Sequence, residues 1–275
     1  MELYISSKDN EKIKNIKKLD DKKYRNKAGL FVTEGIKIVR EAINSMYTIE
    51  FIVYNRETLE KTDNGQDILN EIEKKCANTT CISVTKEILE YLTDTVNPQG
   101  IIAVIKKEEK DILDYLSLNK KEKFLIIDRV QDAGNLGSII RSCNAFCVKN
   151  IICVKGTVDP YMNKVVRSTM GGILKTNIFE IEEEKIEELI NALREKSYKI
   201  FTTSLYNSLD LRDIVKENKI NENAVFVVGN EANGASDMFL EKSDLRVRIP
   251  MEPTAESLNV AMATSIVLYQ QYIAK

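Results

Sequence analysis

The first hundred residues alternate between apolar positions at helical spacing and short, continuous apolar runs. Apolar side chains three or four residues apart predict amphipathic helices, and runs rich in Ile, Val and Tyr predict buried strands. The predicted helices lie near residues 13–19, 36–42, 68–72 and 88–92, and the predicted strands at residues 49–54, 81–84 and 101–105.

A run of charged residues at 106–111 interrupts this pattern and indicates an exposed connector. Beyond it, apolar strand-like runs alternate more strongly with helical patterns, which predicts a mainly parallel sheet with helices on both faces. We therefore predict an α/β protein with a smaller domain at residues 1–108 and a larger one at residues 120–275. In the larger domain the predicted strands lie at 124–128, 151–154, 200–203, 225–228 and 245–249, and the predicted helices near 136–146, 186–194 and 258–272.

The amino-acid composition excludes several kinds of catalytic and metal site. The 275-residue chain contains no histidine, which excludes Ser-His-Asp and Cys-His catalytic groups and histidine metal ligands. Its five cysteines form no Cys-x-x-Cys pair, so we expect buried reduced thiols and no metal. No apolar run is long enough to span a bilayer, and residues 1–20 are charged throughout, so we expect a cytoplasmic protein without membrane contact.

The net charge of −2 hides a basic amino-terminal stretch. Residues 1–27 carry nine Lys or Arg against five Asp or Glu, an excess of +4. Such a stretch suits contact with phosphates, although charge alone favours a solvated helix face over that interpretation.

Glycines and polar residues cluster directly after three predicted strands, in loops at residues 128–141, 227–236 and 249–260. In open α/β sheets, ligands bind at the carboxyl ends of the strands, so these loops are the predicted site. The first loop lacks the glycine pattern of a dinucleotide or phosphate site. The candidate polar residues that we single out in the three loops are Asn135, Arg141, Glu231, Ser257 and Asn259, and helix capping or simple surface exposure explains most of them equally well.

Taken together, the three loops resemble the signature motifs of the SpoU (TrmH-type) family of RNA ribose methyltransferases, within the SPOUT superfamily. The motifs are Asn135-x-Gly-x-x-x-Arg141, Gly229-Asn-Glu231-x-x-Gly234, and Ile-Pro followed by Glu256-Ser-Leu-Asn-Val260, in the expected order. Two positions depart from the family pattern: Ala133 replaces the usual proline, and Cys147 replaces the usual glycine.

The amino-terminal part resembles the substrate-binding domain that often precedes this catalytic domain, which is similar to ribosomal proteins that bind kink-turn RNA. The resemblance rests on Lys22-Lys-Tyr-Arg25, on the residues from Phe31 to Gly35, and on Asn97-Pro-Gln-Gly100. It reverses the interpretation of the basic stretch, which becomes a predicted contact with RNA phosphate. The predicted RNA-binding residues are Lys22, Lys23, Arg25, Arg141 and Arg167.

The resemblance implies transfer of a methyl group from S-adenosylmethionine to a ribose 2′-hydroxyl of RNA, without a metal. Ribosomal RNA of the large subunit (23S) is the implied substrate because of the appended domain. Transfer RNA is the alternative substrate, and a catalytically silent RNA-binding or ribosome-assembly paralogue is the alternative class. The resemblance also implies a trefoil knot in the carboxyl-terminal domain and a homodimer formed through that domain.

The resemblance assigns roles to individual residues as well. We expect Arg141 to orient the ribose and stabilise the developing alkoxide, because a guanidinium is a poor base. Asn135, Glu231, Ser257 and Asn259 would orient Arg141 and the ribose, and Glu231 is the conventional alternative base. The predicted cofactor-binding residues, several of which core packing would explain equally well, are Val228, Gly229, Asn230, Ile249, Pro250, Met251, Leu258 and Asn259.

Overall fold

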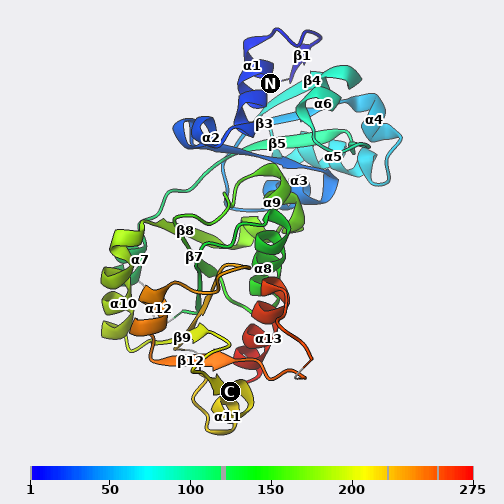
Figure 1. Cartoon of the computed structure of the whole chain (residues 1–275). Helices are drawn as coiled ribbons and strands as arrows, with labels where there is room; N and C mark the ends of the chain where they lie inside the picture. Colours follow the sequence, from blue (N-terminus) through cyan, green and yellow to red (C-terminus); the bar gives the residue numbers. More distant parts are fainter. Residues whose placement is uncertain (1, 119–121, 222, 253, 275) are drawn as a thin grey trace. The chain divides into compact units, whose positions relative to one another are not determined.

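The computed structural model describes residues 2–118, 122–221, 223–252 and 254–274. The chain forms two compact units. The first runs to Glu108 and also includes Tyr161–Leu174, whereas the second comprises Glu109–Pro160 and the chain from Lys175 onward. The colours of Figure 1 follow the chain through both units.

The first unit is built on a five-stranded mixed sheet of order β1-β4-β3-β5-β2. Strands β1, β4 and β3 are mutually parallel, and β5 runs antiparallel to both β3 and β2. Its elements along the chain are β1 (Glu2–Ile5), α1 (Glu11–Lys17), η1 (Lys18–Asp20), α2 (Lys22–Ala28), β2 (Leu30–Glu34), α3 (Ile36–Ile43), β3 (Ile49–Tyr54), α4 (Arg56–Glu60), α5 (Gly65–Lys75), β4 (Thr80–Val84), α6 (Lys86–Leu92) and β5 (Ile101–Lys106).

The segment Tyr161–Leu174 belongs to this first unit, although the sequence assigned it to the second domain. Its helix α9 (Asn163–Ser168) packs beside β2, and the rings of Tyr161 and Phe31 lie with their centroids 5.0 Å apart. Short 3₁₀ turns follow α9 at Gly172–Lys175 (η2). The first unit is therefore completed by residues that come from the middle of the chain.

The second unit is built on a seven-stranded sheet of order β10-β12-β9-β11-β6-β7-β8, in which every neighbouring pair is parallel. Strands β6, β7 and β11 are buried along their whole length, which explains why their sequences are continuous apolar runs. Its elements are α7 (Ile112–Leu118), β6 (Phe124–Ile127), α8 (Ala133–Ala145), β7 (Asn150–Val154), β8 (Asn177–Ile181), η3 (Glu183–Lys185), α10 (Ile186–Glu195), β9 (Lys199–Thr203), β10 (Leu209–Asp210), α11 (Leu211–Lys216), β11 (Ala224–Val228), α12 (Asp237–Lys242), β12 (Leu245–Arg248) and α13 (Val260–Ile273).

Helices cover both faces of this parallel sheet. Helices α7, α10 and α12 lie together on one side, and α8 and α13 pack against each other on the other side (Figure 1). Buried side chains of α7, α10 and α12 form one apolar core with β6, β7, β8, β9 and β11. The predicted α/β fold with a mainly parallel sheet is confirmed.

The structure contains elements that the apolar pattern did not predict. These are β1, α2, β2, α4, α7, α9, β8, β10, α11 and α12. The predicted strands and helices all exist, with ends displaced by a few residues; the last helix begins at Val260 because Asn259 caps it. Across the part of the chain that the structure describes, no helix has both the length and the apolar character needed to cross a membrane.

Candidate active site

Two of the three predicted loops are tied together at the carboxyl ends of β6 and β11, which are neighbours in the sheet. The backbone N–H of Asp128 donates to the Val228 carbonyl at 2.8 Å. The buried Asp128 carboxylate in turn accepts the N–H of Ser236 at 2.5 Å. Val228, a predicted cofactor residue, is itself almost fully buried in the sheet.

A chain of side-chain hydrogen bonds joins all three motifs. The Asn135 amide donates from Nδ2 to Oε1 of Glu231 at 3.0 Å, and its Oδ1 accepts from Nδ2 of Asn259 at 2.9 Å. These residues are separated by about a hundred positions in sequence or more, and three of the five predicted catalytic residues thus lie in direct contact. Asn259 also caps α13, because its Oδ1 accepts the N–H groups of Ala261 and Met262.

Glu231 fastens the second loop to the start of α8. Besides Asn135, its carboxylate accepts the backbone N–H groups of Gln131 and Asp132, each at 3.2 Å. Partial burial pushes the pKa of Glu231 upward, but the hydrogen bonds from Asn135 and from these backbone groups outweigh it and leave the pKa below its usual value. Glu231 is therefore an ionised acceptor with occupied lone pairs, which makes it a weak base.

Gly229 and Asn230, both predicted cofactor residues, shape the second loop. A Cβ on Gly229 would lie 2.1 Å from the backbone of Gly234 and Ala235, so no other residue fits there without displacing the chain. The Asn230 side chain accepts the N–H groups of Ala232 and Asn233 and donates to the carbonyl of Arg129 at 2.9 Å. The loop is thus a closed turn braced against the residues that follow β6.

Arg141 and Ser257, the other two predicted catalytic residues, are exposed. Neither side chain makes a hydrogen bond or an ion pair with any residue that the structure describes. The Asn135–Glu231–Asn259 contacts therefore leave one guanidinium and one hydroxyl available for a ligand. The network fixes the surroundings of both groups, since Arg141 lies on α8 and Ser257 lies two residues before Asn259, the N-cap of α13.

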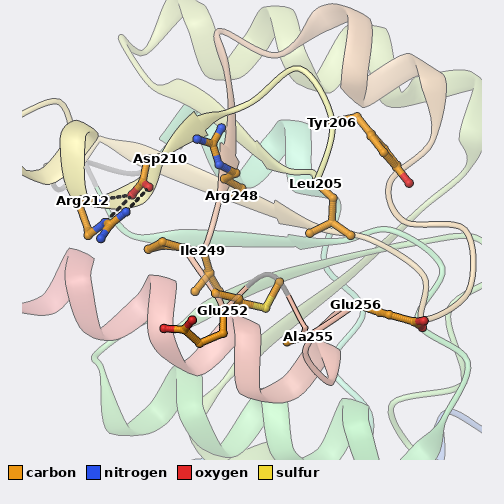
Figure 2. Close-up of a pocket in the computed structure, with 11 residues that line it drawn as sticks. Leu205, Tyr206, Asp210, Arg212, Arg248, Ile249, Glu252, Ala255 and Glu256 are labelled. Carbon is orange, nitrogen blue, oxygen red and sulfur yellow. Dashed lines mark hydrogen bonds and ion pairs between the residues drawn. The ribbon is translucent and has the colours of Figure 1, made fainter.

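A pocket of about 420 Å³ lies where the residues after β9 face those after β12 (Figure 2). The predicted cofactor residues Ile249, Pro250 and Met251 line it, whereas Val228, Gly229, Asn230, Leu258 and Asn259 are not among its lining residues. Leu205 and Tyr206 form another side of the pocket. Sequence reasoning missed this pair, although the strand before it was predicted and the same rule about carboxyl ends pointed to it.

The pocket also carries charged groups that the sequence did not single out. Asp210 accepts from Nε and Nη2 of Arg212 at 3.1 and 2.8 Å, an interaction drawn in Figure 2. The Arg212 hydrogen bonds, with a smaller effect from Arg248, lower the pKa of Asp210 to about 2. Glu252 and Glu256 line the pocket as well. Within the described residues, no group of three or more Cys, Asp or Glu side chains is arranged to hold a metal ion.

The predicted RNA-contact residues of the first unit divide into two kinds. Lys22 and Lys23 are exposed in the first turn of α2. Arg25 is only 3% exposed, and its guanidinium donates to the Leu19 carbonyl at 2.6 Å. Because a buried side chain that is bonded inside the domain does not reach phosphate, Arg25 is removed from the predicted RNA-binding set. Arg167 is half-buried and pairs with two carboxylates.

Two family profiles match this chain. The sequence profile described as the SpoU rRNA Methylase family matches residues 122–269, which is more than half of the chain. The chain belongs to the SpoU rRNA methylase family. The profile of the MRM3-like substrate binding domain matches residues 10–103 of the same chain. The predicted family is therefore confirmed, and a separate substrate-binding domain precedes the methylase domain.

Relatives match the SpoU chain over nearly its full length. The 23S rRNA (guanosine(2553)-2′-O)-methyltransferase RlmP of Bacillus subtilis is 31% identical over 96% of this chain and 97% of that protein. A crystal structure of an AdoMet-bound rRNA methyltransferase from Sinorhizobium meliloti is 26% identical, with a TM-score of 0.82 over 98% of this chain and 97% of the other. The SpoU methyltransferase AviRb of Streptomyces viridochromogenes, at 22% identity and a TM-score of 0.81 over 96% of this chain and 97% of the other, shows the same SPOUT fold.

Proposed function

We propose that this protein transfers a methyl group from S-adenosylmethionine to a ribose 2′-hydroxyl of 23S ribosomal RNA. The observation that carries the proposal is the bonded set Glu231–Asn135–Asn259, which fixes the helix that carries the exposed Arg141 and the start of α13 just after Ser257. Family membership and the activity of the Bacillus subtilis relative support the same reaction and substrate.

The pocket between the residues after β9 and β12 suits S-adenosylmethionine. Its volume of about 420 Å³ falls within the range of roughly 300 to 1,000 Å³ common for small-molecule sites. Leu205, Ile249 and Met251 offer apolar surface for the adenosine, and the Asp210–Arg212 pair offers both charges to the zwitterionic methionine end. S-adenosylmethionine, when bound, supplies an activated methyl group.

The protein's own contribution to the reaction is mainly positioning. In-line transfer requires the 2′-oxygen to be held opposite the leaving sulfur, and holding it there supplies much of the rate increase. Arg141 binds the ribose-phosphate of the substrate and stabilises the negative charge that develops on the 2′-oxygen. Glu231 keeps Asn135 and the start of α8 in place, and its lowered pKa together with its occupied lone pairs argues against proton acceptance by this residue.

Methylation assays distinguish this function from its alternatives. Purified protein, radiolabelled S-adenosylmethionine, and 23S rRNA or tRNA from a strain lacking the gene would be incubated, and the labelled nucleotide mapped. We expect 2′-O-methylribose in 23S rRNA. Label in tRNA alone would establish the tRNA enzyme instead, and absence of both label and cofactor binding would establish a silent paralogue.

We further propose that the protein acts as a homodimer through α13. Thr264, Val267 and Leu268 of this helix are buried in the second unit. The opposite side is also apolar yet exposed, because Met262, Ile266, Tyr269 and Ile273 follow one another at helical spacing. Exposed apolar stripes of this kind are typical of interfaces between chains.

Light scattering after gel filtration tests the dimer. Wild-type protein is expected at twice the chain mass, and Tyr269→Glu at the mass of one chain because a charge would be buried at the interface. Tyr4→Glu, at a tyrosine that is 71% exposed in the first unit, is the matched control and should remain dimeric. A monomeric wild-type protein, or a dimeric Tyr269→Glu, would refute this interface.

Three further features are part of the proposal. Residues 1–108 would act as the RNA-binding domain and residues 120–275 as the methyltransferase domain, with Lys22 and Lys23 contacting RNA phosphate. The strand order, in which the chain from β11 to β12 passes β9, supports a knotted carboxyl-terminal topology. We also infer a cytoplasmic location, because ribosomal RNA is the proposed substrate.

A further inference from the structure

Helix α9 brings a cation to two carboxylates of the first unit. Arg167 Nη1 lies 3.3 Å from Asp94 Oδ2 and 3.6 Å from Glu34 Oε2. The Glu34 side chain is only 9% exposed, so its charge is poorly solvated and depends on its partners. Thr95 Oγ1 donates a hydrogen bond to the other oxygen of Glu34. Arg167 therefore neutralises a buried carboxylate at the end of β2 and an exposed one in the loop after α6.

A second residue of α9 joins the same loop to the start of α2. Nδ2 of Asn163 donates to Oδ1 of Asp20 at 2.9 Å and to Oδ2 of Asp94 at 3.1 Å. Asp20 immediately precedes Asp21, whose side chain caps α2 by accepting the N–H of Tyr24. The loop and the helix that presents Lys22 and Lys23 are thus parts of one hydrogen-bonded group.

The loop at residues 93–100 is held at both ends and free at its tip. Asp94 and Thr95 are bonded at one end, and at the other end Gln99 Oε1 accepts the N–H of Ile36 at 2.9 Å. Between them Val96 is 95% exposed. Such an arrangement presents the tip in a fixed position as long as the bonds at its ends persist, and Asn163 links one of these ends to Asp20, two residues before Lys22.

The charges around Arg167 indicate how it would affect RNA binding. With its guanidinium already between two carboxylates, Arg167 has little positive charge to offer to a phosphate. Without it, Glu34 and Asp94 would repel each other and would also repel any RNA phosphate that approaches Lys22 and Lys23. The benefit of Arg167 to RNA binding is thus the cancellation of nearby negative charge.

We propose that Arg167 is a positioning residue for RNA: by neutralising Glu34 and Asp94 it holds the loop at residues 93–100 and maintains the cationic surface of α2, without contacting RNA itself. This inference rests on the proposed function, because it requires that the first unit binds RNA. Arg167 lies within the residues that match the methylase family, yet it belongs to the first unit and would serve RNA binding by that unit.

A double-mutant cycle on the full-length protein tests the proposal. The four proteins are wild type, Arg167→Met, the Glu34→Gln/Asp94→Asn variant, and the variant with all three changes. The dissociation constant for an unmodified 23S rRNA transcript would be measured by filter binding at several salt concentrations, alongside KM for the transcript, kcat, and the affinity for S-adenosylmethionine.

In the wild-type background, Arg167→Met should weaken RNA binding about tenfold and raise KM for RNA, with kcat and S-adenosylmethionine affinity within about twofold. In the Glu34→Gln/Asp94→Asn background, the same change should have almost no effect, since no charge is left to neutralise. The variant with all three changes lacks the buried unpaired carboxylate, so it tests the proposal even if Arg167→Met fails to fold.

Two results would overturn the proposal. An equal loss in both backgrounds, with the slope of log affinity against log salt falling by about 0.9, would mean that Arg167 contacts a phosphate directly. No loss in either background would mean that Arg167 does not serve RNA binding at all. A wild-type protein that fails to bind the transcript, with S-adenosylmethionine affinity intact, would instead refute the proposed substrate.

Discussion

Replacing Glu231 by Gln distinguishes two roles for this carboxylate, positioning of the loops and acceptance of the substrate proton. The change keeps the size of the side chain but places an amide NH₂ where one oxygen accepted a backbone N–H. One hydrogen bond is lost, and the remaining ones lose their charge assistance. A hydrogen bond to a charged group contributes about 1.5–3 kcal/mol, and partial exposure lowers the expected loss here to about 1–2 kcal/mol. Since about 1.4 kcal/mol corresponds to tenfold, we expect the single-turnover rate to fall roughly tenfold.

The assay is single-turnover methylation of 23S rRNA between pH 5 and pH 9. The hydrogen-bonded carboxylate has a lowered pKa, so the stability that its bonds contribute is present above the ordinary carboxyl pKa and is lost only as the pH falls through the lower folded value. Wild-type and Glu231→Gln profiles should therefore have the same shape across this range. Glu241→Gln, which removes an exposed carboxylate on α12, is the matched control and should behave as wild type.

A general base at this position would give a different result. Removing such a base costs about 10²–10⁴-fold in the chemical step and changes the acid limb of the pH profile. A loss of that size in the single-turnover rate, together with an altered profile, would show that the carboxylate accepts the 2′-hydroxyl proton. The interpretation of Glu231 as a clamp would then be refuted.

Three further predictions concern the loops, the pocket and the thiols. Gly229→Ala should lower the melting temperature by several degrees in thermal denaturation, because its Cβ would lie 2.1 Å from backbone atoms; an unchanged value would contradict this. Arg212→Met should weaken S-adenosylmethionine binding in equilibrium dialysis about tenfold and leave RNA affinity unchanged. Loss of RNA affinity with unchanged S-adenosylmethionine affinity would refute the assignment of this pocket to the cofactor. Brief alkylation of the native protein, read by mass spectrometry, should label the exposed Cys147 far ahead of Cys143, which is fully buried and whose pKa burial raises; equal labelling would refute the assigned burial.

Much of the second unit could be predicted from local pattern alone. Strands such as β7 and β11 are buried on both faces, so their sequences are continuously apolar and stand out from their surroundings. The order of the strands could not be predicted, because β11 lies between β9 and β6 through long crossovers that leave no local signal. The short edge strand β1 was missed for the related reason that its stability comes from pairing with β4.

The sequence predicted which residues lie together at the candidate site better than it predicted what each residue does. Asn135, Glu231 and Asn259 do lie together, as the motif order suggested. Arg25 and Lys22 look alike in a basic sequence, and only the tertiary structure reveals that Leu19 provides a buried acceptor for one of them. Leu19 lies only six residues before Arg25, but whether its carbonyl meets the guanidinium depends on how the intervening chain folds and packs, which the charge pattern alone does not contain.

The division of labour among the motif residues fits the reaction that we propose. Methyl transfer to a hydroxyl gains most from alignment of the reacting atoms, so few groups need to perform proton chemistry. Gly229, Asn230 and Glu231 are all engaged in holding loops, whereas Arg141 has no partner among the described residues and is exposed. Variants of the holding residues should therefore lose activity in proportion to the disorder they cause, and conservative changes such as Glu231→Gln should keep part of it. Arg141→Lys keeps the charge but not the planar fork that binds phosphate and ribose together, so it should lose more activity than Glu231→Gln while leaving the melting temperature unchanged.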